Sequence, residues 1–220
     1  MKIIVGNKRI HKLISDKQYR NKVTFYVSVF STTLMALFNG TLGVVYLSVW
    51  YGSLAVYYIA LAGQRLYVFL RSKWLTNNVK DSNLLALKAN TLYFINGIIV
   101  IAMIFALSFS VVQMVLLGKP IVAGKITAIT IATYTFYKIT MAVINLVKDN
   151  KTNDKIAMTI RNINLVDALV SILSLTVTLL TTFGSGKNWS AMIICVSTGI
   201  STCIVALGVI MIVKSKKTRG

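Results

Sequence analysis

The sequence has no glutamate, and its only acidic residues are five aspartates. It contains one proline, one histidine and two cysteines among 220 residues. No apolar segment carries a His/Glu cluster, a Ser–His pair or a glycine-rich phosphate loop, so we do not predict an enzyme. The lone His11 has no Cys-x-x-Cys motif near it, and we therefore predict neither a metal site nor another cofactor. Cys195 and Cys203, eight residues apart in one apolar run, are too far apart on a helix to form a disulfide with each other.

Charge of any kind is scarce. Only 13% of the residues are charged, 56% are hydrophobic, and the mean hydropathy is +0.73, which excludes an ordinary soluble domain. The net charge of +19 raises the alternative of a nucleic-acid-binding protein. We predict no nucleic-acid partner, because the cations punctuate apolar runs and form no basic stripe with interleaved aromatic residues.

Six apolar segments are long enough to cross the hydrocarbon core of a bilayer, which takes about 20 residues. We therefore predict an all-α polytopic membrane protein with six transmembrane helices. The domain at 23–213 would contain helices at about 23–47, 51–70, 89–117, 126–147, 162–183 and 190–213. A basic segment, 1–22, precedes it and a basic tail, 214–220, follows it. Residues 1–22 fit equally a short amphipathic helix on the membrane surface and a disordered basic tail.

The positions of the cations predict the orientation. Of the 24 Lys and Arg residues, 19 fall in the two terminal segments and in the connections 71–88 and 148–161. Lys119, Lys125 and Lys187 alone fall on the opposite side. Because basic residues of short connections stay in the cytoplasm, both termini are predicted to be cytoplasmic, and the partners are the bilayer and its anionic lipid head groups. The basic composition and the short connections indicate a multi-pass protein of the cell membrane, most simply a bacterial plasma membrane, with an organelle membrane as the alternative.

Three charged residues lie inside apolar segments: Arg65, Lys138 and Asp167. An ionisable group within the membrane is costly, and it is by default a candidate functional site. Counting 1.5 Å per residue from the cytoplasmic ends, Arg65 and Asp167 should lie at about the same depth, with Lys138 deeper.

Two stretches resemble a known family. Tyr51–Arg71, YGSLAVYYIALAGQRLYVFLR, is similar to the second transmembrane helix of cation diffusion facilitators, which follows a Gly-Ser-Leu-Ala opening. Asp167 and Ser171 in VDALVSILSL are similar to the Ser-Asp-x3-Ser pattern of the family's fifth helix. The resemblance implies a transporter-like scaffold with six spans, neighbouring second and fifth helices, and a homodimer.

The departures from that family concern its metal ligands. The positions where the family has ligands are Ala62 and Leu66 in the second span and Ile163 in the fifth, so one of four ligands, Asp167, is present. A transition-metal ion needs several anionic or imidazole ligands to displace its water. The family's C-terminal cytoplasmic domain is also missing from this sequence. The resemblance therefore implies the scaffold without the family's metal transport.

Two interpretations of the three charges stay open. In the structural one, which the missing ligands favour, an Arg65–Asp167 ion pair replaces the metal, and Thr hydroxyls and backbone carbonyls hold Lys138. In the functional one, Asp167 accepts a proton or a cation in a polar cavity open to the cytoplasm, gated by Arg65 or Lys138. The remaining polar residues expected to line such a cavity are Asn164, Gln64, Asn96 and Ser171.

Three functions follow from these interpretations. The first is a small secondary transporter, coupled to protons or cations, for an unknown small ion or solute. The second is a six-helix substrate-binding subunit of a larger transport complex. The third is a membrane scaffold that transports nothing.

Overall fold

Six long helices make up the protein. A computed structural model describes residues 17–79, 81–116, 124–148, 155–184 and 189–217, and this part of the chain contains no strand. The helices are α2 (Lys17–Val45), α3 (Val49–Asn78), α4 (Ser82–Leu116), α5 (Lys125–Lys148), α6 (Lys155–Phe183) and α7 (Ser190–Lys217). Each is long and apolar enough to span a membrane, which confirms the all-α class and the six candidate spans. Most of the basic segment 1–22 lies outside the described residues.

The helices run past the apolar segments from which they were predicted. The polar connection 71–88 is largely helical, since α3 continues to Asn78 and α4 begins at Ser82. The Oδ1 atom of Asp81 accepts a hydrogen bond from the backbone N–H of Asn83 at 2.9 Å, which satisfies a free donor at the start of α4. Apolar length sets the part of a helix that crosses a bilayer, whereas polar residues can extend the same helix beyond it.

A tight turn joins α2 to α3. Leu47 adopts a left-handed backbone conformation, with φ of 48°, and the Ser48 hydroxyl caps α3 by accepting from the backbone N–H of Tyr51. The two helices approach so closely that a Cβ atom on Gly43 would lie 2.9 Å from the backbone nitrogen of Gly52. The two helices therefore form a closely packed antiparallel pair.

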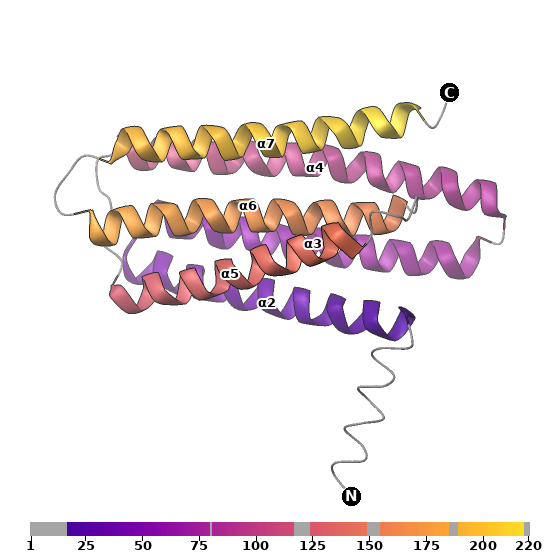
Figure 1. Cartoon of the computed structure of the whole chain (residues 1–220), viewed down its shortest axis with the longest axis horizontal. Helices are drawn as coiled ribbons and strands as arrows, with labels where there is room; N and C mark the ends of the chain where they lie inside the picture. The colour runs from indigo at the N-terminus through magenta and orange to yellow at the C-terminus, as the bar shows by residue number, and fades with distance from the viewer. Residues whose placement is uncertain (1–16, 80, 117–123, 149–154, 185–188, 218–220) are drawn as a thin grey trace, which may run out of the picture.

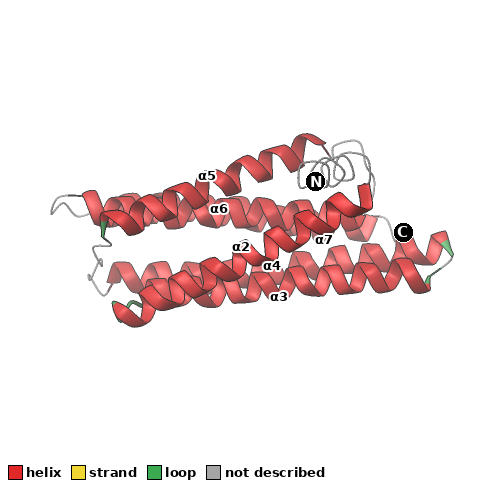
Figure 2. Cartoon of the chain, turned by 90° about the horizontal axis from the view of Figure 1, so that it is seen from below, coloured by secondary structure: helices red, strands yellow, loops and turns green. Residues whose placement is uncertain are grey.

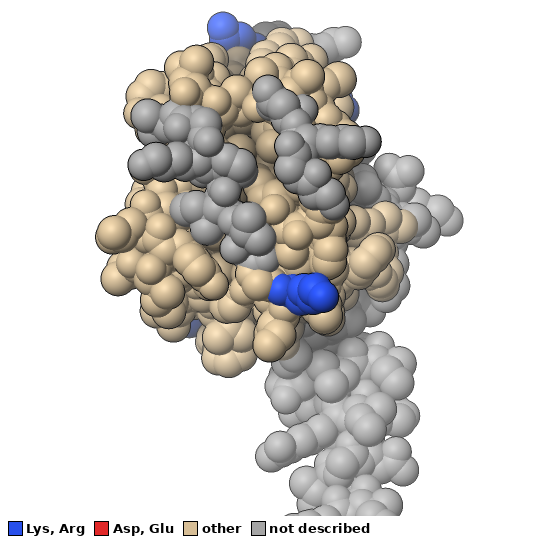
Figure 3. All heavy atoms as spheres, turned by 90° about the vertical axis from the view of Figure 1, so that its left-hand side faces the viewer, with Lys and Arg blue, Asp and Glu red and all other residues tan. Residues whose placement is uncertain are grey.

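The chain runs up and down through the bundle, so α2 begins and α7 ends at the same end, here called the terminal end (Figure 1). The last turns of α3 and α5 and the first turns of α4 and α6 also lie there. Among the described residues drawn at the opposite end, few are Lys or Arg (Figure 3). Among the described residues close to the connections at that end, Lys125 is the one cation. The described helix ends that flank the predicted basic connections thus lie at one end of the bundle.

Helix α6 is the centre of the bundle. It packs against α3, α4, α5 and α7, and 56% of its most apolar stretch is buried, against 22% for α2 and for α7. By contrast, α2 packs its backbone closely only against α3, and α5 only against α6, over their described residues. Figure 2 shows α2 crossing the bundle obliquely and α5 diverging from α6 towards the terminal end. Any group at the middle of α6 is therefore shielded on several sides.

Small residues hold α4 against α7. A Cβ atom on Gly97 would lie 3.0 Å from the carbonyl oxygen of Gly208, and one on Gly208 would lie 2.5 Å from Cγ1 of Ile101. Near the terminal end, Asn90 donates from its amide to the Ser215 carbonyl at 2.7 Å, and the Ser215 hydroxyl donates to the Asn90 carbonyl at 3.0 Å. Close backbone approach and interhelical hydrogen bonds are the means by which helices associate in lipid.

Candidate functional site

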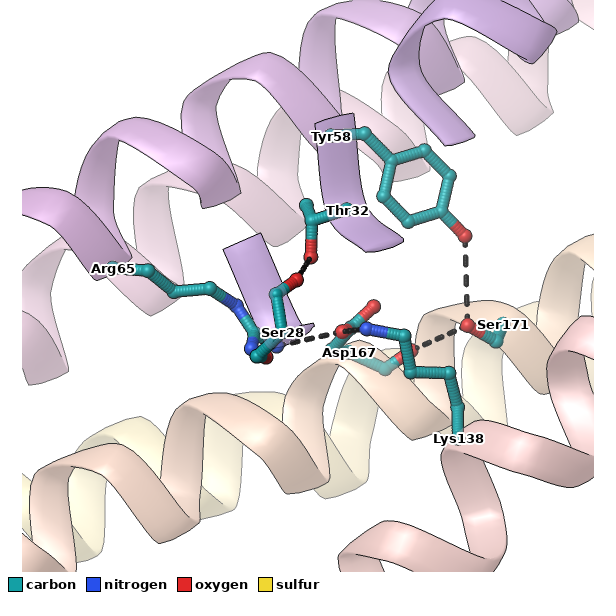
Figure 4. Close-up of polar contacts among 7 residues, drawn as sticks. All are labelled: Ser28, Thr32, Tyr58, Arg65, Lys138, Asp167 and Ser171. Carbon is teal, nitrogen blue, oxygen red and sulfur yellow. Dashed lines mark hydrogen bonds and ion pairs between the residues drawn. The ribbon is translucent and has the colours of Figure 1, made fainter. Parts of the chain in front are cut away.

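The structure brings the three intramembrane charges into one cluster, the charged triad of Arg65, Lys138 and Asp167 (Figure 4). Arg65 Nη2 lies 2.6 Å from Oδ2 of Asp167, and Lys138 Nζ donates to the same oxygen. The three side chains come from α3, α5 and α6, so this one carboxylate oxygen links three helices. Asp167 is fully buried, while Arg65 and Lys138 are 6% and 5% exposed.

The contacts of Lys138 differ from those expected under the structural interpretation. Its ammonium is not held by Thr hydroxyls and instead reaches Asp167, and it also lies 5.1 Å from the centre of the Tyr134 ring. The long flexible stem of a lysine and the tilt of α5 make this reach feasible. Three of the α5 threonine hydroxyls, those of Thr130, Thr133 and Thr140, instead donate to carbonyls four residues earlier in their own helix.

The triad carries an excess of positive charge. Two cations share one carboxylate, so the buried cluster has a formal charge of +1. It is also incompletely hydrogen-bonded: Oδ1 of Asp167 and Nε of Arg65 are buried without a partner within the described structure. A buried ionic cluster stabilises a protein only when its charges and its lone pairs are both satisfied. The triad does not meet this criterion, because it has both an excess charge and buried polar atoms without partners.

Hydrogen bonds hold the triad on the side away from the terminal end. Ser171, one turn after Asp167, donates to the Asp167 carbonyl at 2.8 Å and lies 3.5 Å from the Tyr58 hydroxyl (Figure 4). Thr135 donates to the Ser171 carbonyl at 3.1 Å, which ties α5 to α6 at this level. Ser171 is therefore a packed, hydrogen-bonded residue that fixes the position of Asp167.

Three tyrosines fill the space on that same side and form what we call the tyrosine layer: Tyr57, Tyr58 and Tyr134. Tyr57 and Tyr58 come two turns before Arg65 on α3, and Tyr134 comes one turn before Lys138 on α5. The Tyr58 ring makes edge-to-face contacts with the Tyr57 and Tyr134 rings at centroid distances of 5.3 Å and 6.3 Å. Tyr58 is fully buried. The tyrosine layer therefore lies between the triad and the end of the bundle opposite the terminal end.

A cavity of about 290 Å³ lies on the other side of the triad, between α2, α5 and α6. Its polar wall consists of Ser28, Tyr137, Lys138, Asn145, Asn164 and Asp167, and its apolar wall of Val27, Met141 and Ala142. Asn145 lies two turns past Lys138, and Asn164 one turn before Asp167, so both amides are on the terminal-end side of the triad. Val27 is 47% and Tyr137 39% exposed, which places the mouth of the cavity at the surface between α2 and α5.

The four residues predicted to line a polar cavity divide among different roles. Asn164 lines the cavity. Gln64 and Asn96 do not line it and instead bond to each other across α3 and α4, with Gln64 Nε2 donating to Asn96 Oδ1 at 3.0 Å. Ser171 is packed behind the triad. Of these four residues, Asn164 therefore lies on the cavity wall, whereas the other three are hydrogen-bonded inside the bundle.

Sequence reasoning did not single out Ser28, Tyr137 and Asn145 as cavity residues. Asn145 follows Lys138 by seven residues, which places both on one face of α5, and this spacing was a usable signal. Ser28 lies on α2, a helix from which the sequence suggested no site residue. Its role depends on how α2 crosses the bundle, which no local pattern reveals.

Comparison of the chain with protein-family models, with curated proteins and with solved structures finds no match. Within the described part of the chain, no three His, Cys, Asp or Glu side chains come together. A divalent metal ion at Asp167 would have to displace both Arg65 and Lys138 from the carboxylate and would find no second anionic ligand there.

Proposed function

We propose that this protein is a small proton-coupled secondary transporter of the cell membrane, with the charged triad as its coupling site. The observation that carries the proposal is the asymmetry around Asp167. A cavity that opens between α2 and α5 lies against the triad on its terminal-end side, and the tyrosine layer packs on the opposite side. Access from one side at a time is the property that a transporter must have.

Proton coupling follows from the shared oxygen. Both cations are bound to Oδ2 of Asp167, so a proton on this carboxylate would weaken two interhelical ion pairs at once. Helix α5 would respond most, because over its described length it packs its backbone closely only against α6. A change of charge at one atom would thus shift a helix between two positions, which is the requirement for coupling a proton to a conformational change.

A proton suits this site better than a metal cation. Asp167 already has two positively charged partners, and a third cation would add to an excess positive charge. The resemblance to cation diffusion facilitators therefore supports the six-span scaffold in this proposal and not the family's cargo. The proposed orientation has both termini in the cytoplasm, as the positions of the cations along the sequence favour, and the cavity would then lie in the cytoplasmic half of the bilayer.

Proton flux into liposomes containing the purified protein tests the proposal. Lys138→Met is the principal variant, because it leaves a neutral Arg65–Asp167 pair and should fold. We expect flux in the wild type under a solute gradient and none in Lys138→Met or in Asp167→Asn.

Two controls make the result specific. Lys125→Met removes an exposed cation from the same helix, and Asp81→Asn removes an exposed carboxylate outside the apolar segments. Both should transport like the wild type. Unchanged flux in Asp167→Asn and in Lys138→Met would exclude the triad as the coupling site. Absence of flux from a monodisperse wild type, across a panel of solutes, would leave the substrate-binding subunit and the scaffold as the alternatives.

A further inference from the structure

The cavity beside the triad has a chemical character that the proposed function does not specify. Its walls combine one ammonium group, one carboxylate, two amides and two hydroxyl groups with three apolar side chains. Its volume of about 290 Å³ is at the lower end of the range of small-molecule sites, roughly 300–1,000 Å³. That is far more space than a single bare ion fills. A small solute with a polar head and an apolar body would match both parts of the wall.

The charge of the triad selects the sign of that solute. With Arg65 and Lys138 against Asp167, the buried formal charge is +1, and a monovalent anion would reduce it to zero. A monovalent cation would raise it to +2. Because uncompensated charge away from water is costly, the two cases differ strongly in favour of the anion.

The second oxygen of the Asp167 carboxylate favours a cation instead. Oδ1 of Asp167 is buried without a hydrogen-bond donor, so an ammonium group could bind to it. A single such hydrogen bond would, however, place a third cation next to Arg65 and Lys138, which already share the other oxygen. The repulsion from two cations outweighs the attraction of one carboxylate that is already paired.

The neighbours of Lys138 supply the remaining contacts for an anion. Asn145 and Asn164 lie on α5 and α6 at the terminal-end side of Lys138, and Ser28 faces them from α2. Amide N–H and hydroxyl groups donate hydrogen bonds to a carboxylate, and an ammonium group strengthens this binding as a charged donor. Val27, Met141 and Ala142 would contact the apolar body of the solute.

From this charge balance and this wall, we infer that the cavity binds a small monocarboxylate with an apolar body. Its carboxylate is bound by Lys138 with Asn145 and Asn164, and its apolar body lies towards the mouth between α2 and α5. That this monocarboxylate is the transported solute rests on the proposed function. The binding itself does not depend on transport.

Equilibrium binding of radiolabelled benzoate to the detergent-purified protein tests the inference. We expect saturable binding, displaced by unlabelled butyrate and not by benzylammonium or benzyl alcohol. Lys138→Met should weaken it at least about tenfold, as the loss of a charged hydrogen-bond donor does. Asn145→Leu and Asn164→Leu, which change no charge, should each weaken it severalfold. Lys125→Met is the matched control, and its affinity should equal that of the wild type.

Three outcomes would overturn the inference: no saturable benzoate binding to monodisperse wild-type protein, equal affinity in Lys138→Met, or saturable binding of benzylammonium in preference to benzoate. Size-exclusion profiles of all variants show whether each is folded. If Lys138→Met does not fold, the two Asn→Leu variants still test the cavity. Proton flux in liposomes separates this inference from the proposed function. Benzoate binding without flux would refute transport alone, while flux with no carboxylate binding would refute the inference alone.

Discussion

Removing the carboxylate of Asp167 should destabilise the protein, and removing Lys138 at the same time should restore part of the lost stability. Asp167→Asn leaves two cations at a site where Arg65 and Lys138 are 6% and 5% exposed. Removing one partner of a buried ion pair lowers the free energy of unfolding by about 3–5 kcal/mol, since it leaves a buried charge without compensation. We therefore expect Asp167→Asn to lower the free energy of unfolding by about this amount.

The geometry also gives the size of the rescue. Both cationic nitrogens bind the same oxygen, so they are within about 6 Å of each other. Two like charges about 6 Å apart repel by roughly 3 kcal/mol at an effective dielectric constant of about 20. The double variant Lys138→Met/Asp167→Asn lacks this repulsion and should be more stable than Asp167→Asn by a similar amount. Lys138→Met alone loses one attraction and one repulsion, so it should stay within about 1 kcal/mol of the wild type.

Reversible unfolding in mixed micelles with increasing sodium dodecyl sulfate, followed by tryptophan fluorescence, measures these differences. Asp81→Asn is the control, because asparagine and aspartate cap helices about equally well, and its stability should not change. A stability of Asp167→Asn within 1 kcal/mol of the wild type would refute the burial and pairing of the carboxylate. A double variant less stable than Asp167→Asn would refute the assignment of both cations to one oxygen.

Three further predictions concern the scaffold. Gly208→Leu should separate α4 from α7 and lower the unfolding midpoint, because even a Cβ atom there would lie 2.5 Å from Ile101 Cγ1; a cysteine crosslink between the two helices, formed in the wild type and lost in the variant, checks this. Asn90→Leu should cost about 1–3 kcal/mol in the same unfolding assay, since it removes the amide donor to the Ser215 carbonyl in a buried contact, and an unchanged midpoint would contradict that bond. Leu47→Gly should raise stability by about 1 kcal/mol, because glycine adopts the left-handed backbone at φ of 48° without steric cost; a loss of stability would contradict that conformation.

The number and class of the helices could be predicted from the sequence because they depend on local composition. A bilayer sets the apolar length that each span needs, and that length can be counted along the chain. Helix ends were less accessible, since polar residues carry α3 on to Asn78 and begin α4 at Ser82 within a stretch predicted to be a connection. Counting residues from the cytoplasmic ends of the spans also predicted that Arg65 and Asp167 lie at about the same depth.

The tertiary structure alone decided how the charges and amides are combined. Whether Lys138 reaches Asp167 depends on the tilt of α5 and on the rotation of two helices about their axes. The rotations of α3 and α4 likewise pair Gln64 with Asn96, and those of α5 and α6 place Asn164 on the cavity wall with Asn145. Spacing along one helix predicts which residues share a face, but it carries no information on which face of a neighbouring helix they meet. For that physical reason the sequence determined the spans and the candidate charges of this protein, whereas packing determined that they form a net positive cluster beside a cavity.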